Sequence, residues 1–211
     1  MSSKERKLKE KEARRESILE AARSVFVEKG LRGSTVDEIA ARAELGKGTI
    51  YLYFKVKEAI YMALIEKGLA LLEERLRSAV DPSLRADANL RRLSEAYYRF
   101  YEEEPHYFKL LMYCNLEETK AIVDIKAVEQ ASLGCLSSVS AVIQKGVREK
   151  IFSPKVVAGK AAAVLWAASL GVLFLFGQDQ GKGRIFNLDV KELLSIEVEL
   201  FMKGLRKSDS K

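Results

Sequence analysis

The apolar residues of this chain recur at helical spacing from about residue 18 onward. The first stripe falls at i, i+3, i+4, i+7 and i+8, which predicts a helix over about residues 14–29. Its members are Ile18, Ala21, Ala22, Val25 and Phe26. Gly30 follows the stripe at a position typical of a left-handed helix cap, so we expect the helix to end there.

Two short helices joined by a tight turn are expected next. Thr35 lies three residues before Glu38, and this spacing is a capping box, which begins a helix. The following helix is predicted over about residues 47–54, after a turn that contains Gly46. Such a pair occurs in some enzymes, but it is typical of a helix-turn-helix, whose second helix lies in the major groove of DNA.

The rest of the chain also predicts helices throughout. They are expected at about residues 57–78, 86–103, 119–149 and 155–177, with a short one from Pro105 and a last one from Asp189. Neither strand alternation nor an internal repeat is found in the sequence. We therefore predict an all-α fold of about nine helices. Residues 1–56 are expected to form a three-helix N-terminal helix-turn-helix domain, and residues 57–211 a C-terminal helical bundle.

Composition and charge narrow the classes of function. The net charge of +6 favours a polyanionic partner, since each basic contact with phosphate releases counterions. Residues 2–15 are highly charged, and two interpretations stay open for them: a disordered segment or a basic arm that reaches along DNA. They lack the apolar core of a signal peptide. One histidine, two cysteines, no metal-ligand spacing and no phosphate-binding loop argue against an enzyme, a metal site or a cofactor.

The run from Ala161 to Gly177 is the most apolar stretch of the chain. Its 17 residues are at the lower limit of what spans a bilayer. A helix that is apolar all round is also typical of a core helix at a dimer interface. We favour the interface because no second span supports the membrane.

The second short helix and its flanks carry side chains that suit contact with DNA. Lysine ammonium groups and tyrosine or threonine hydroxyls bind phosphate oxygens, and a glycine permits close approach of the backbone. The candidate residues are Thr35, Lys47, Gly48, Thr49, Tyr51, Tyr53 and Lys57. Thr35, as a helix cap, also places backbone N–H groups where an anion binds.

The segment from about residue 15 to residue 66 closely resembles the N-terminal domain of the TetR family of repressors. The resemblance is carried by the stripe described above and by the strings Lys47-Gly48-Thr49-Ile50-Tyr51 and Tyr53-Phe54-Lys55, followed by Lys57-Glu58. It implies phosphate contacts from Thr35, Lys47, Tyr51, Tyr53 and Lys57, and base-edge contacts near Gly48 and Thr49. It also implies a C-terminal bundle of about six helices and a dimer built mainly from the last two.

Three positions depart from the family pattern. Glu44 stands where glycine is usual, Gly46 where serine or threonine usually caps the recognition helix, and Leu52 where histidine is frequent. These departures bear on one phosphate contact and on the docking angle. Leu52 could instead pack against a thymine methyl group.

The C-terminal half is expected to hold an effector and the dimer contact. Aromatic and methionine side chains at helical spacing fit either ordinary core packing or an apolar cavity between helices. The candidates for the cavity are Tyr97, Tyr101, Phe108, Met112, Tyr113, Trp166 and Phe174. Those for the dimer interface are Leu165, Leu170, Leu173, Leu194, Val198 and Phe201.

The sequence thus predicts a cytoplasmic, ligand-responsive transcriptional regulator, in the first instance a repressor. As a homodimer it would bind double-stranded DNA at a near-palindromic operator, and a small, largely apolar effector would release it. The alternative is a helical interaction or membrane-associated protein without DNA binding.

Overall fold

The computed structural model describes residues 2–114, 119–177 and 188–206. These residues form nine α-helices and contain no strand, so the predicted all-α fold is confirmed. The chain divides into two compact units, which are residues 1–68 with 106–129 and residues 69–105 with 130–211. The domain boundary near residue 56 stays a prediction.

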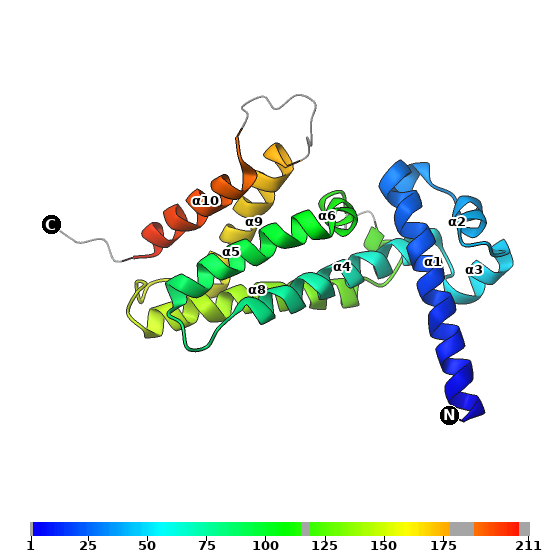
Figure 1. Ribbon diagram of the computed structural model, residues 1–211, viewed down its shortest axis with the longest axis horizontal. Helices are drawn as coiled ribbons and strands as arrows, with labels where there is room; N and C mark the ends of the chain where they lie inside the picture. The colour runs from blue at the N-terminus through cyan, green and yellow to red at the C-terminus, as the bar shows by residue number, and fades with distance from the viewer. Residues whose placement is uncertain (1, 115–118, 178–187, 207–211) are drawn as a thin grey trace. The chain divides into compact units, whose positions relative to one another are not determined.

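The first helix is longer than its apolar stripe predicts. Helix α1 spans Ser3–Gly33 (Figure 1), and Ser2 and Glu5 form a capping box at its start. A start near residue 14 and a disordered N-terminal segment were therefore wrong. The charged segment is rich in Lys, Glu and Arg, which are good helix formers and extend a helix that is packed further along. Gly30 has a φ of +70° and a ψ of 173°, which is not the left-handed helical conformation of the predicted cap but is one that glycine adopts easily, and it kinks α1 before one more turn.

The first unit is built on the apolar face of α1. Helices α2 (Val36–Arg42) and α3 (Lys47–Tyr53) and the first half of α4 (Lys57–Ala79) supply the side chains that this face buries. The core includes Ile18, Ala22, Val25, Phe26, Ile39, Ile50, Phe54, Ile60, Leu64 and Ile65. Phe26 and Tyr61 meet edge to face with ring centroids 5.2 Å apart. The Tyr61 hydroxyl donates to the Leu110 carbonyl of α6 (Pro105–Met112) at 3.0 Å, which joins α6 to this core.

The second unit is a helical bundle. The second half of α4 packs there with α5 (Ala86–Glu103), α8 (Lys126–Arg148), α9 (Ala158–Phe176) and α10 (Val190–Leu205). The buried side chains include Leu72, Leu76, Leu90, Leu93, Phe100, Cys135, Val142, Ile143, Phe152, Ala162, Leu173, Leu194, Val198 and Met202. Helix α10 lies against both α5 and α9.

Helix α8 begins later than predicted. The expected start at residue 119 was wrong, because residues 121–125 are not helical and α8 begins at Lys126. The Asp124 carboxylate accepts a hydrogen bond from the Lys126 backbone N–H at 3.0 Å. This local bond satisfies a donor that helix starts leave free.

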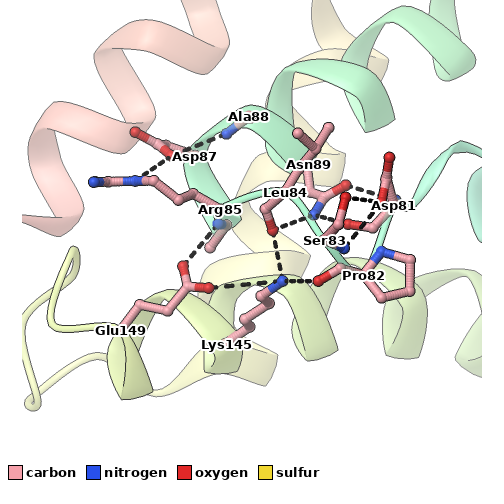
Figure 2. Close-up of polar contacts among 11 residues, drawn as sticks. Asp81, Pro82, Ser83, Leu84, Arg85, Asp87, Ala88, Asn89, Lys145 and Glu149 are labelled. Atoms are coloured by element: carbon pink, nitrogen blue, oxygen red, sulfur yellow. Dashed lines mark hydrogen bonds and ion pairs between the residues drawn. The ribbon is translucent and has the colours of Figure 1, made fainter.

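The connection between α4 and α5 is held by two polar side chains, the buried Asn89 and the partly exposed Lys145 (Figure 2). Asn89 accepts from the Asp81 backbone N–H at 2.8 Å and donates to the carbonyls of Asp81 and Leu84. The Lys145 ammonium of α8 donates to the carbonyls of Pro82 and Leu84 at 2.7 and 2.5 Å. The turn is therefore fixed to α8, which orders this end of the bundle.

Helix α9 is the most apolar of the described helices. By length and composition alone it could cross a membrane, and it is the one described helix for which this holds. Only 22% of its apolar window is buried within the chain. A large apolar face of α9 therefore stays exposed in a single copy.

Candidate nucleic-acid interface

Local hydrogen bonds build the helix-turn-helix. The Glu38 backbone N–H donates to the Thr35 hydroxyl oxygen at 3.2 Å, and the Thr35 backbone N–H donates to the Glu38 carboxylate at 2.9 Å. The capping box expected from the sequence is thus confirmed. Gly46 precedes α3 as its N-cap and offers no side-chain hydrogen bond, and Ile50 is fully buried and anchors α3 to the core.

The turn between α2 and α3 contains a residue in the left-handed region. Glu44 has a φ of +55°, a conformation that glycine adopts more easily than residues with a Cβ. The Leu45 backbone N–H donates to the Ala40 carbonyl at 2.9 Å and closes the turn. The conformation gives a physical reason for the glycine that the family usually has at the position of Glu44.

Three ion pairs link α1, α2 and α3. Lys29 pairs with Glu38, and Arg42 pairs with Glu28 at 2.6 Å. The hydrogen bond from Lys29 lowers the pKa of Glu38, and the hydrogen bond from Arg42 lowers the pKa of Glu28. All four side chains are partly exposed, so each pair orients the helices more than it stabilises them.

The third ion pair involves the first residue of α3. The Lys47 ammonium lies 2.8 Å from the Asp37 carboxylate of α2. Asp37 raises the pKa of Lys47 through this hydrogen bond and its charge. Lys47 is therefore a firmly protonated cation on the surface of the helix-turn-helix.

Helix α3 presents most of the predicted DNA-binding residues on its surface. Lys47 and Gly48 are exposed, Tyr51 is 39% exposed, and Thr49 and Tyr53 are half-buried. Leu52 is 77% exposed. A Cβ added at Gly48 would meet nothing within 4 Å, so packing within the chain does not require glycine there. The structure thus gathers five of the seven predicted residues on one short helix, with both tyrosines accessible.

The other two predicted residues flank α3 and already have partners within the chain. The Thr35 hydroxyl accepts from Glu38 and donates to its carboxylate at 3.1 Å. The Lys57 ammonium donates to the carbonyls of Leu31 and Ser34 at 2.5 and 2.7 Å. Lys57 therefore caps the end of α1, a role that sequence reasoning missed because the partners lie 26 and 23 positions away.

The seven predicted effector residues lie in two different units. Tyr97, Tyr101, Trp166 and Phe174 belong to the second unit, and Phe108, Met112 and Tyr113 belong to the first. In the second unit, Tyr97 and Trp166 line a cavity of about 40 Å³ with apolar side chains of α4, α5, α8 and α9. Burial raises the pKa of Tyr97, whose oxygen is hydrogen-bonded by Trp166. The Tyr101 hydroxyl donates to the Gly177 carbonyl.

A carboxyl group that the sequence did not single out lies close to this cavity. Ser169 lines the cavity, and its hydroxyl is 2.9 Å from a Glu197 carboxylate oxygen and 3.0 Å from the Leu165 carbonyl. Burial raises the pKa of Glu197 to about 7. Glu197 stands within the apolar stripe of α10, and this polar interruption was the available signal.

Most of the predicted dimer residues are buried within a single copy of the chain. Leu165, Leu173, Leu194 and Val198 are at most 8% exposed, and Leu170 and Phe201 are half-buried. The exposed apolar side chains of α9 and α10 are Val164, Phe174, Leu175, Ile196 and Leu200. Each helix thus has one apolar face toward its own unit and another toward its surroundings.

Comparison with known proteins gives two family matches. A model described as bacterial regulatory proteins of the tetR family matches residues 18–64. A model described as a tetracyclin repressor-like C-terminal domain matches residues 87–192. The two matches together cover the helix-turn-helix and most of the second half of the chain.

Similar proteins are regulators of transcription. The HTH-type regulator YhgD of Bacillus subtilis is 27% identical over 67% of this chain and 73% of its own length. The HTH-type activator FasR of Mycolicibacterium smegmatis is 31% identical over 48% of this chain and 46% of its own. The crystal structure of the regulator FadR of Bacillus subtilis, in complex with stearoyl-CoA, has a TM-score of 0.72 at 20% identity. The superposition covers 90% of this chain and 98% of the FadR chain. At this identity the comparison shows a shared fold.

Proposed function

This chain belongs to the tetR family of bacterial regulatory proteins, and from that premise we propose that it is a homodimeric, ligand-responsive repressor. It binds a near-palindromic operator in the cytoplasm and acts by binding rather than by catalysis. A small, largely apolar effector releases it from DNA.

The proposal depends above all on the surface of α3. A buried Ile50 fixes the helix, while Lys47, Gly48, Tyr51 and Leu52 are exposed. Lys47, Tyr51 and Tyr53 donate to phosphate oxygens and set the register, and the backbone at Gly48 with the Thr49 hydroxyl approaches base edges. Thr35 and Lys57 approach phosphate from either side, in addition to the bonds that they make within the chain.

The exposed apolar faces of α9 and α10 support a dimer. Val164 and Leu200 are each 61% exposed, and Leu175 is 70% exposed. Two such helices per copy would form a four-helix interface about a two-fold axis. The dimer would cover α9 without a membrane, and it would match the symmetry of a near-palindromic operator.

The cavity of the second unit is the proposed centre of the effector site. Its lining is mainly apolar, with Ser94, Tyr97, Trp166 and Ser169 as the residues that carry polar groups. Its volume of about 40 Å³ leaves room for little more than one or two water molecules, so an effector must separate the helices to enter. A fatty acyl chain fits a narrow apolar space between helices, and the relative FadR was crystallised with stearoyl-CoA.

Release from DNA requires the effector to prefer one arrangement of the dimer. Only a difference in affinity between the DNA-bound and the released arrangement shifts the equilibrium. An effector that separates the bundle helices would supply that difference. Phe108, Met112 and Tyr113 of the first unit stay predicted contacts of the effector.

Selection from a random duplex library tests the function. Purified protein should enrich a near-palindromic sequence, and the affinity for it should fall steeply with salt concentration. Stearoyl-CoA or a related acyl thioester should weaken this binding, and a promoter that carries the selected site should be less active in the presence of the protein. Absence of DNA binding at low salt would favour a helical interaction protein instead, and increased promoter activity would indicate an activator.

A further inference from the structure

The first four turns of α1 form a helical arm that contributes nothing to the core. The arm, residues 3–15, is exposed at every position. Figure 1 shows it projecting beyond α2 and α3 of the same unit. At 1.5 Å per residue, 13 residues reach about 20 Å. The Ser2–Glu5 capping box fixes its free end, and the packed part of α1 fixes its direction.

Basic side chains outnumber acidic ones on this arm, and four of the basic ones share one face. Between residues 4 and 15 there are seven basic and three acidic side chains. Lys4, Lys7, Lys11 and Arg14 follow one another at i, i+3, i+7 and i+10, so they share one face of the helix. We call these four residues the basic stripe. Glu5, Glu12 and, just beyond the arm, Glu16 follow at i, i+7 and i+11 on another face, whereas Glu10 lies beside the stripe and pairs with Arg6.

Contacts at the base of the arm give the direction of the two faces. The basic stripe continues at helical spacing into Ile18 and Val25, which are buried in the helix-turn-helix core. Beside the stripe, the Arg15 guanidinium lies 5.2 Å from the ring centre of Phe54, the residue that follows α3. Glu16, in contrast, pairs with Lys67 of α4. The basic stripe therefore faces the side of α3, and the acidic face points toward α4.

The cations of the stripe are available to a partner. Among the described residues, Lys4, Lys7 and Lys11 make no ion pair within the chain, whereas Arg6, which lies off the stripe, pairs with Glu10 at 3.5 Å. The arm carries one large apolar side chain, Leu8, so it lacks the apolar face by which a helix enters a lipid surface. Evenly spaced cations on a helix that has no apolar face fit the phosphates of a duplex.

We propose that this arm is a second DNA-binding element, which lies along the phosphate backbone outside the groove that α3 enters. The inference rests on the proposed DNA-binding function and extends it to residues 4–14. Because the arm is already helical, binding does not require a disordered segment to fold, which would cost affinity. Its contacts depend on charge and not on base sequence.

Two full-length variants with equal loss of charge test the proposal. K7Q/K11Q removes two cations of the basic stripe, and R6Q/K9Q removes two cations of the same arm that lie off the stripe. Glutamine keeps the helix propensity, and far-ultraviolet circular dichroism checks this. Binding to a 30-base-pair duplex of arbitrary sequence is measured by fluorescence anisotropy over a series of salt concentrations. The variant K47A serves as the reference for loss of the contact by α3.

The arm is supported if K7Q/K11Q binds about tenfold more weakly at low salt and R6Q/K9Q stays within about twofold of the unaltered protein. The slope of log affinity against log salt should fall by about 0.9 for each lost phosphate contact. An equal loss in both variants would mean diffuse attraction and would overturn the proposal. Unchanged binding by K7Q/K11Q and R6Q/K9Q, with weak binding by K47A, would also overturn the proposal. The role of α3 in DNA binding would then stand without the arm. If K7Q/K11Q lost binding to phosphatidylglycerol vesicles but not to DNA, the stripe would be a lipid-binding surface and the proposal would be overturned. If the unaltered protein had no affinity for DNA, the proposed DNA-binding function itself would be wrong.

Discussion

The Lys47 ammonium at the start of α3 lies 2.8 Å from the Asp37 carboxylate of α2. Lys47, which we propose binds a DNA phosphate, is therefore held in place by the Asp37 carboxylate on the same surface. Asp37 keeps Lys47 oriented, and it also brings a negative charge close to the path of the DNA backbone. DNA must then compete with Asp37 for the ammonium group.

The variant Asp37→Asn should bind DNA more tightly than the unaltered protein. It removes the competing charge and the repulsion of phosphate, while the amide keeps the shape of the side chain. Exposed ion pairs contribute about 0.2–1 kcal/mol, so we expect a gain in affinity of about two- to fivefold. Anisotropy titrations at several salt concentrations measure it. A double-mutant cycle with Lys47→Ala provides the control, since the part of the gain that comes from competition for Lys47 should vanish without it and only the part that comes from repulsion of phosphate should remain. Weaker binding by Asp37→Asn would mean that the ion pair positions Lys47 for phosphate.

The variant Glu44→Gly should stabilise the helix-turn-helix. Glu44 has a φ of +55°, and a left-handed conformation costs a residue with a Cβ about 1–2 kcal/mol relative to glycine. Glycine also gains freedom in the unfolded chain, so we expect a net gain of about 1 kcal/mol. The midpoint of thermal unfolding measures it. Glu44→Ala keeps the Cβ and should give no gain, and equal stabilisation by alanine would assign the effect to the lost charge.

The variant Lys57→Met should destabilise the first unit. Lys57 supplies two hydrogen bonds to the carbonyls of Leu31 and Ser34, and methionine keeps the apolar stem but loses both donors. Hydrogen bonds to charged groups contribute about 1.5–3 kcal/mol, and partial exposure of Lys57 places the expected loss near the lower value. Hydrogen exchange of the first unit and thermal unfolding measure it. Lys55→Met, at an exposed neighbouring position, is the control and should leave the stability unchanged.

Local features of this fold were predictable from the sequence. The capping box of Thr35 and Glu38 and the cap at Asp189 were read correctly because both partners of each bond lie within three residues. The start of α6 at Pro105 was correct for the same reason, since proline suits the first turn of a helix. The exposed surface of α3 followed from one buried residue, Ile50, and the helical period.

Features that depend on distant parts of the chain were not predictable. The partners of Lys57 are more than 20 positions away, so its bond to the end of α1 left no pattern in the sequence. Helices α9 and α10 are apolar on two faces, and periodicity cannot tell which face meets the same chain. The side chains of Leu194 and Val198 were expected at the dimer interface, yet they fill the core of their own unit.

Glu197 should make the stability of the second unit depend on pH. Burial raises its pKa from the ordinary value of 4.5 to about 7, so the folded chain binds the proton more tightly than the unfolded chain. Stability should therefore fall as the pH rises from about 4.5 to about 7 and change little from this cause above that. Glutamine at position 197 imitates the protonated form, so Glu197→Gln should match the unaltered protein at pH 5 and be more stable at pH 8.

Urea unfolding at the two pH values measures this effect. Glu199 on the same helix is the control, because the hydrogen bond from Arg91 lowers its pKa and gives the opposite sign. Glu199→Gln should be slightly less stable at pH 8 and closer to the unaltered protein at low pH. A variant Glu197→Gln that is less stable at pH 8 would show that the charged carboxylate is favoured at this position.

The exposed apolar side chains of α10 should decide the oligomeric state. Ile196 and Leu200 are 48% and 61% exposed, so Ile196→Glu with Leu200→Glu should leave each copy folded and give a monomer near 23.7 kDa in sedimentation. Ser195→Glu, an exposed change on another face of α10, should stay dimeric. Glutamate at the buried positions of Leu194 and Val198 would instead unfold the second unit, since unpaired charges do not persist in an apolar core. An intact dimer with Ile196→Glu and Leu200→Glu would place the contact between copies on another surface.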